Sequence, residues 1–459
     1  MKKIWDRKFF AFVLAIAVPI MVQNAITNFV ALLDNIMIGQ LGTEPMSGVA
    51  IVNQLIFVFN ITVFGAVGGA GIFTSQFHGS SNPEGIRQTF RYKMLLALLI
   101  VLAGFVILGG FPEPLINAWL HQSESVGDLA ATMQSAKDYL RIMLWGLLFF
   151  AVKDVYASTL RETGHALPPM IAGLIAVAVN LALNYLLIFG KLGCPALGVV
   201  GGAWATVISR VVECAIVVIW SHTHPVENPF IPGLYRSVAI QPALAKQITL
   251  KGMPLLFNEL LWAAGVAMLS RCYAQRGLDV VAGYNIASAV VEVTAVVYIA
   301  IGNASAIVLG QILGSGNKER AWQSVPKLIF LAGTVCTGVG LAQIGLSAVI
   351  PALYNTSAEI RQIAKLFIIL YGCFQPMYAI STVEYFTLRS GGKMLTTFLF
   401  DSLYSWVLAV PLAAALIWWT SLPATTVYLA VQVTELLKAI LGYFYVKRKT
   451  WLNNLVQNY

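Results

Sequence analysis

Charged residues are scarce in this sequence. Asp, Glu, Lys and Arg together make up 11% of the chain, whereas soluble domains carry about 25%. Apolar residues account for 58%, and so large an apolar surface needs a lipid bilayer to cover it. The composition therefore excludes an ordinary soluble domain and predicts an integral membrane protein whose first partner is the lipid bilayer.

Cysteine and histidine are also rare. The chain has 5 cysteines, scattered and without a C-x-x-C pair, and 5 histidines, so neither a disulfide framework nor a Cys/His metal centre is expected. His222 and His224 alternate on a proline-rich loop without a third ligand, which favours a solvated loop. Because nucleophile motifs and phosphate-binding loops are missing too, we expect no enzymatic activity and no cofactor.

The basic residues do not form a surface for nucleic acid, although the formal net charge is +9. Most Lys and Arg fall in every second connection between apolar segments, beginning at the N-terminus and ending with Lys447, Arg448 and Lys449. This is the positive-inside pattern. We therefore expect a multi-pass protein of the cell (inner, plasma) membrane with both termini in the cytoplasm and no nucleic-acid partner.

Long apolar segments follow one another along the whole chain. Each suits a crossing of the bilayer, which takes about 20 residues. The first has no cleavage signal after it, so it is expected in the mature protein. The fold class predicted is all-α, with 12 transmembrane helices near residues 10–39, 46–75, 93–111, 136–160, 168–189, 200–220, 253–274, 281–309, 327–350, 363–387, 395–419 and 424–446.

The chain consists of two related halves. Q-F-H-G-S-S-N-P-E (Gln76–Glu84) recurs as Q-I-L-G-S-G-N-K-E (Gln311–Glu319), and the polar, proline-rich stretch 221–251 separates the halves. An even number of spans gives both halves the same orientation, so an axis along the membrane normal should relate them. We predict two six-helix lobes, 1–220 and 252–459, joined by a cytoplasmic linker and with the functional site between them.

The first span contains an acid. At about 100° per helical residue, Gln23, Thr27 and Asp34 fall on one stripe of this helix. A carboxylate among lipid tails is costly unless it faces a wet or paired interior, so Asp34 is predicted to bind an ion or a cargo in a cavity that Gln23 and Thr27 also line. Pro19 is where we expect the helix to bend when Asp34 changes charge.

The equivalent span of the second half carries Asn258 and Glu259 after Pro254. Proline donates no backbone hydrogen bond, so the first turn is expected to bend and to leave a carbonyl free. With that carbonyl, Asn258 and Glu259 would form an oxygen-rich site for a proton or a hard cation, and Na⁺ at Glu259, Asn258 and Asp34 is the candidate metal site. The acids do not follow the repeat, because Leu269 stands at the position equivalent to Asp34.

Further polar residues lie inside predicted spans. Asn285 and Glu292 fall on one stripe of their helix and are expected to face the same cavity. Asn180 and Asn184 are one turn apart and either join helices or line a polar pocket. For Glu384, an ion-coupling role and a structural role are both open.

Other charges in the spans have simpler interpretations. Lys153–Asp154, Arg210–Glu213 and Glu435–Lys438 are close enough in sequence to form structural pairs. Asp401, early in its span, either caps backbone groups or takes part in the site. Aromatic and methionine side chains are abundant, and those that line an acidic cavity would suit flat cationic organic molecules.

Three motifs resemble the multidrug and toxic compound extrusion (MATE) family. They are L-D-N-I-M-I-G-Q-L-G (Leu33–Gly42), the Q-x-x-G-x-x-N-x-E loop of both halves, and L-R-E-T-G-H (Leu160–His165). The resemblance covers essentially the whole chain and implies two six-helix bundles arranged as a V. By the same resemblance, Asp34 matches the acid of the N-terminal lobe, and Glu259 matches the seventh-helix acid of the NorM-like branch.

Two positions depart from the family pattern. The DinF-like branch carries an aspartate where this chain has Asn184, which argues for NorM-like ion coupling. NorM-like members carry an acid in helix ten near the position of Tyr378, and Glu384, six residues further on, is the candidate to replace it.

The resemblance implies a secondary active transporter, expected as a monomer, that exports small cationic or amphipathic organic molecules in exchange for Na⁺ or H⁺ by alternating access. The alternative is a flippase of the same superfamily for a lipid-linked oligosaccharide or peptidoglycan precursor. Its polyanionic substrate would need unpaired bases in the spans, whereas Lys153, Arg210 and Lys438 each have an acid nearby in the sequence. This pattern favours cation export.

Overall fold

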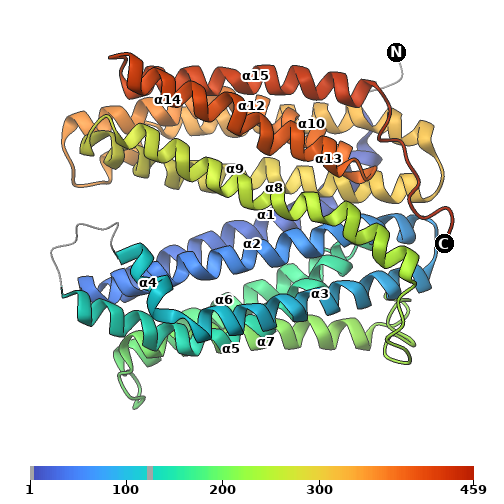
Figure 1. Ribbon diagram of the computed structural model, residues 1–459, viewed down its shortest axis with the longest axis horizontal. Helices are drawn as coiled ribbons and strands as arrows, with labels where there is room; N and C mark the ends of the chain where they lie inside the picture. The colour runs from blue at the N-terminus through green and yellow to red at the C-terminus, as the bar shows by residue number, and fades with distance from the viewer. Residues whose placement is uncertain (1–4, 121–127) are drawn as a thin grey trace. The chain divides into compact units, whose positions relative to one another are not determined.

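The computed structural model describes residues 5–120 and 128–459, and all regular structure in this part of the chain is helical. This confirms the predicted all-α fold class. The helices, coloured from blue to red along the chain in Figure 1, are α1 (Arg7–Gly39), α2 (Thr43–Gly79), α3 (Pro83–Gly110), α4 (Pro112–Leu120), α5 (Leu129–Glu162), α6 (Leu167–Phe189), α7 (Gly198–Thr223), α8 (Pro242–Ala274), α9 (Leu278–Gly314), α10 (Lys318–Leu346), α11 (Val349–Ala352), α12 (Ala358–Ser390), α13 (Met394–Phe398), α14 (Val410–Trp419) and α15 (Ala424–Lys447), with two π-helical segments, η1 (Leu399–Leu403) and η2 (Ser405–Ala409).

Among the described residues, 11 helical segments are long and apolar enough to cross a membrane. They correspond to every predicted span except 136–160. That stretch also forms a long helix, α5, of 34 residues. It carries Lys153, Asp154, Arg161 and Glu162 towards its C-terminal end, and these charges lower its hydropathy.

The eleventh predicted span, 395–419, is irregular inside. Between α13 and α14 the chain forms η1 and η2, where the backbone hydrogen bonds skip one residue further than in an α-helix. Pro19 and Pro254 lie inside helices that continue on both sides of them, α1 and α8. The bends predicted at these two prolines stay predictions.

Val22–Thr74 and Pro83–Gln247 form one compact unit, here called unit 2. Most of the predicted linker is ordered within it. Phe230 is fully buried and packs on Phe90 of α3, with 5.9 Å between the ring centroids, while the hydroxyl of Tyr235 contacts that of Tyr156. The stretch between the two halves is therefore a folded element rather than a free tether.

The stretch up to Met21, Ser75–Asn82 and Ile248–Tyr459 form the other compact unit, unit 1. This division assigns the α2–α3 loop to the unit that holds most of the second half of the chain. The predicted sequence lobes 1–220 and 252–459 stay a prediction.

The two copies of the repeated loop meet inside unit 1. A Cβ on Gly79 would overlap the carbonyl oxygen of Gln311, and a Cβ on Gly314 would overlap that of Gln76. The glycine of each copy thus packs on the glutamine of the other. This reciprocal backbone contact gives a physical reason for the Q-x-x-G pattern in both halves.

The C-terminal tail after α15 covers this contact. Gln76 is fully buried, and its Nε2 donates to the carbonyl oxygens of Ser390 (2.9 Å) and Asn453 (3.2 Å). The backbone N–H of Leu455 donates to Gln76 Oε1 (2.6 Å). Both polar ends of this glutamine are therefore satisfied, as a buried amide requires.

Candidate functional site

Polar side chains of unit 2 gather around Asp34 of α1. Asn184 Nδ2 on α6 donates to Asp34 Oδ1 (2.5 Å) and to Asn180 Oδ1 (3.1 Å). Asn180 Nδ2 donates to Thr206 Oγ1 on α7 (3.4 Å), and Tyr139 of α5 also hydrogen-bonds Thr206. These five residues, here called the Asp34 cluster, come from four helices.

The Asp34 cluster combines one carboxylate with amide and hydroxyl groups only. Asn180 and Asn184 are buried, and Asp34 is half-buried. In the part of the chain that the structure describes, no Lys or Arg forms an ion pair with Asp34. Hard oxygen donors of this kind suit a proton or Na⁺. Asn184 joins α6 to α1 and Asn180 joins α6 to α7, and the polar pocket that they were expected to line stays a prediction.

Gln23 and Thr27 do not join the cluster. Thr27 Oγ1 donates to the carbonyl oxygen of Gln23 in the same helix (2.8 Å). Gln23 Oε1 accepts from Arg161 Nη1 (3.4 Å). The three residues share one stripe of α1, but about 16 Å of helical rise separates Gln23 from Asp34.

Several bases in the helices of unit 2 have acidic partners, although not the expected ones. Lys153 Nζ lies 3.8 Å from Glu213 Oε1, and Arg161 Nη2 lies 3.8 Å from Asp154 Oδ1. The predicted Lys153–Asp154 pair is therefore wrong, because consecutive residues point in different directions from a helix. Arg210 is within electrostatic range of Glu213, but no ion pair or hydrogen bond joins the two among the described residues, and Arg210 Nη1 is buried without a hydrogen-bond partner. The predicted Arg210–Glu213 pair stays a prediction.

A second polar cluster lies in unit 1 around Asn258 of α8. Asn258 Nδ2 donates to Tyr385 Oη and to Asp401 Oδ2, both at 3.1 Å. Ser402 Oγ donates to the carbonyl and side-chain oxygens of Asn258, both at 2.8 Å. Lys438 Nζ lies 2.7 Å from Asp401 Oδ1. These five residues are here called the Asn258 cluster.

Glu259 lies beside this cluster but has other neighbours than Asn258. Arg389 Nη1 approaches Glu259 Oε1 to 4.0 Å, and Tyr385 hydrogen-bonds the same carboxylate. The sequence reasoning missed Arg389 and Tyr385 as partners. Glu259 thus differs from Asp34 in having a guanidinium group close to it.

Asp401 is a member of the Asn258 cluster, and the two roles left open for it stay predictions. It lies in η1, and π-helical turns are frequent at functional sites. Lys438, assigned to a structural pair with Glu435, contacts Asp401 as well as lying within electrostatic range of Glu435. A signal was available, since Asp401, Glu435 and Lys438 are the charged residues within the last two predicted spans.

The remaining predicted acids, Glu384 and Glu292, belong to unit 1. Glu384 of α12 is 1% exposed and packs against Gly442 of α15. Its Oε2 has no hydrogen-bond partner among the described residues. Glu292 and Asn285 of α9 are exposed. Their predicted roles in ion coupling stay predictions.

Tyr378 stands where the resemblance places an acid in helix ten. Its hydroxyl donates to Gln432 Oε1 (2.8 Å), and its ring stacks with that of Tyr371 at 4.9 Å between centroids. Tyr371 is almost fully buried. This part of unit 1 is an aromatic core rather than a lining of acids.

A site for a Cys/His-type metal is not found in residues 5–120 and 128–459, where no group of three or more His, Cys, Asp or Glu could hold an ion. His222 stacks on Tyr235 and His224 on Trp220, at 5.8 and 4.7 Å between ring centroids. The Na⁺ site predicted at Glu259, Asn258 and Asp34 stays a prediction.

Comparison with known families gives one match that covers most of the chain. The family model MatE matches residues 19–186 and 254–415. The probable multidrug resistance protein NorM of Thermotoga maritima is 25% identical over 407 residues, which cover 88% of this chain and 84% of that protein. The multidrug resistance protein MdtK of Edwardsiella ictaluri is 24% identical over 410 residues, covering 87% of this chain and 85% of that protein.

Solved structures share the fold. One is described as the outward-facing conformation of a multidrug resistance MATE family transporter of the MOP superfamily; it has a TM-score of 0.85 and 18% identity, with 96% of each chain covered. Another, MATE in complex with MaL6, has a TM-score of 0.83 and 19% identity, also with 96% of each chain covered.

Proposed function

This chain belongs to the MatE family, and from that membership we propose that it is a secondary active transporter that exports cationic or amphipathic organic compounds in exchange for Na⁺ or H⁺. The names of its relatives, which include multidrug resistance proteins, support efflux of several unrelated compounds. The protein works as a monomer in the plasma membrane, with both termini in the cytoplasm, and has neither enzymatic activity nor a cofactor.

The observation that carries the proposal is the environment of Asp34. Its carboxylate lies in a membrane helix, accepts a hydrogen bond from Asn184 and has no ion-pair partner among the described residues. A charge in that setting is stabilised by a counter-charge that arrives from solution. A proton, a Na⁺ ion and an organic cation can all fill that role.

Competition for this one negative charge couples the two fluxes. If the site held an ion and an organic cation together, it would carry excess positive charge in a medium of low dielectric constant, which is unfavourable. Binding of the ion on the outside therefore releases the organic cation, and loss of the ion on the inside restores the attraction. The ion gradient supplies the free energy for export.

The Asn258 cluster has a different role in this mechanism. Lys438 neutralises Asp401, and Arg389 lies close to Glu259. A carboxylate whose charge is already compensated within the protein attracts a cation less strongly than the carboxylate of Asp34 does. Glu259 contributes to coupling only when it separates from Arg389, and Asp34 is the main coupling acid.

No observation favours the flippase alternative over cation export. A polyanionic substrate needs several free bases, but Lys153 lies near Glu213 and Lys438 contacts Asp401. These two bases therefore have acidic partners, and Arg210, whose Nη1 is buried without a hydrogen-bond partner among the described residues, is a single base rather than several. Asp34 has no ion-pair partner among the described residues.

The experiment that tests the proposal is transport by the purified protein in proteoliposomes. Ethidium uptake is measured under an inward or outward gradient of Na⁺ alone, of pH alone, and with neither. We expect one gradient to drive ethidium against its own concentration difference and the other to have little effect. Ethidium movement that neither gradient changes would contradict coupled antiport.

A further inference from the structure

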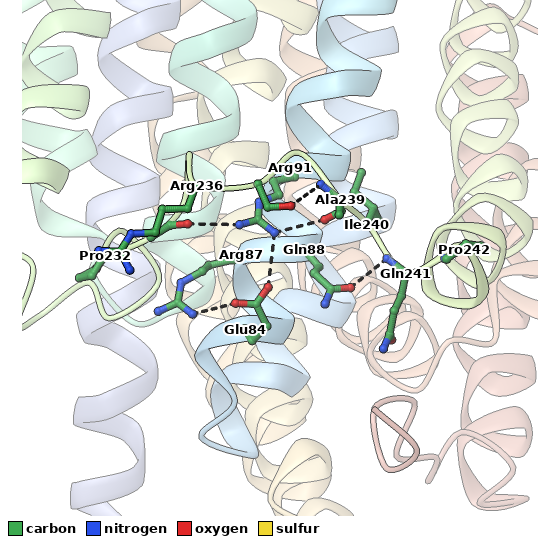
Figure 2. Close-up of a pocket in the computed structure, with 12 residues that line it drawn as sticks. Glu84, Arg87, Gln88, Arg91, Pro232, Arg236, Ala239, Ile240, Gln241 and Pro242 are labelled. Carbon is green, nitrogen blue, oxygen red and sulfur yellow. Dashed lines mark hydrogen bonds and ion pairs between the residues drawn. The ribbon is translucent and has the colours of Figure 1, made fainter.

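Unit 2 contains a cavity of about 670 Å³ that shares no residue with the Asp34 cluster. It lies between the first turns of α3 and the linker that leads to α8, as Figure 2 shows. This volume is within the range of small-molecule sites, about 300–1,000 Å³. The charged side chains of its lining are Glu84, Arg87, Arg91 and Arg236.

Two of the arginines fasten the linker to α3. Arg87 donates to the carbonyl oxygens of Pro229 and Phe230, at 3.1 and 3.2 Å. Arg91 donates in the same way to other carbonyl oxygens of the linker, those of Gly233, Leu234 and Ala239. Both also pair with Glu84, which lies between them in Figure 2, so the one acid of the lining is already neutralised.

Other donors of the lining remain available. In the part of the chain that the structure describes, the guanidinium of Arg236 forms no hydrogen bond or ion pair, and the residue is exposed. Gln88 accepts from the backbone N–H of Gln241 through Oε1 (3.1 Å), which leaves its NH₂ group to donate. The hydroxyl of Ser237 accepts from Ala239 N (3.0 Å) and can still donate. The cavity therefore offers hydrogen-bond donors and an excess of positive charge.

We propose that this cavity is a binding site for a phosphate-bearing anion, with Arg236, Gln88 and Ser237 as the groups that contact it. Guanidinium groups are well matched to phosphate oxygens, because they donate two parallel hydrogen bonds to them. An anion there would connect the linker to α3 and so fix the segment that joins the two halves of the chain. This ligand is opposite in charge to the proposed transport substrate, and its site is independent of Asp34.

Two sources could supply the phosphate. Arg87 and Arg91 lie near the start of a candidate membrane span, Pro83–Gly110, which is the depth at which lipid headgroups lie. The headgroup of an acidic phospholipid therefore fits the location, and a soluble phosphate compound fits the same donors. The experiment has one arm for each source.

The lipid arm uses native mass spectrometry of the full-length protein in detergent, with phosphatidylglycerol or zwitterionic phosphatidylcholine added. Arg236→Ala removes a guanidinium that forms no hydrogen bond or ion pair within the described structure, so folding should not change. Gln88→Glu keeps the acceptor for Gln241 and adds a negative charge. Lys246→Ala, on an exposed residue outside the lining, removes one positive charge nearby and is the matched control.

For phosphatidylglycerol, we expect binding about tenfold weaker in Arg236→Ala and in Gln88→Glu than in wild type or Lys246→Ala. The soluble arm measures pyrophosphate binding to delipidated protein by calorimetry with the same variants. The same ranking of the four proteins in either arm supports the site, and the arm in which it appears identifies the source of the phosphate. Equal binding by all four proteins in both arms, or an equal loss in Lys246→Ala, would overturn it.

Discussion

Replacing Asp34 by asparagine removes one negative charge and little else. The asparagine keeps a carbonyl oxygen where Asp34 Oδ1 now accepts from Asn184, at 2.5 Å. The hydrogen bonds that link Asn184 to Asn180, and Asn180 to Thr206, do not involve Asp34 and should persist. Asp34→Asn therefore tests charge rather than folding.

The size of the effect follows from the setting of the carboxylate. A monovalent cation about 4 Å from a carboxylate gains about 4 kcal/mol at an effective dielectric constant of about 20. Because Asp34 is half-buried and partly screened, we expect roughly half of this, about 2 kcal/mol. That corresponds to about thirtyfold weaker binding of an organic cation.

The assay is ethidium efflux from cells or uptake by inverted vesicles, with expression levels matched. The control is Asp138→Asn, because Asp138 also lies in a helix of unit 2, α5, but among the described residues its side chain accepts a hydrogen bond only from Gln134 of its own helix. Efflux should fall at least tenfold in Asp34→Asn and stay near wild type in Asp138→Asn. Wild-type efflux by Asp34→Asn would refute the reasoning.

Two further predictions concern stability, measured as thermal unfolding of the purified protein. Lys438→Met leaves the partly buried carboxylate of Asp401 without its cationic partner and should cost about 3 kcal/mol. Most of this loss should be recovered when Asp401→Asn is added, and no recovery would show that Lys438 does not stabilise the protein through this pair. Gly79→Leu forces a side chain onto the carbonyl of Gln311 and should cost at least about 2 kcal/mol. The control Gly338→Leu, at a position with open space, should be nearly neutral. Similar losses of stability in the two variants would contradict the close packing of the repeated loops.

Much of the fold could be predicted from the sequence, because membrane spans depend on local composition. Apolar runs of sufficient length predicted 12 helical segments, and α5 differs from the others by the charged residues towards both of its ends. The interruption of the span 395–419 by η1 and η2 could not be predicted. It depends on tertiary contacts of residues such as Asp401 and Ser402 with other helices.

The candidate site was only partly predictable, since helical periodicity gives the face of a residue but not its partner. Asp34 and Asn184 were singled out separately, and only the structure brings them together. Conversely, Gln23 shared a stripe with Asp34 and yet contacts Arg161. Lys438 was assigned to its neighbour in sequence because its contact with Asp401 joins two different helices.

The central claim is that the coupling ion and the organic cation compete for the charge of Asp34. The most direct test is equilibrium binding of ethidium to the purified protein, followed by fluorescence, first with increasing Na⁺ at constant pH and then with decreasing pH without Na⁺. One of the two ions should weaken ethidium binding to the wild-type protein, and this dependence should disappear in Asp34→Asn. If Asp34→Asn shows the same dependence on the ion as wild type, the competition does not take place at Asp34.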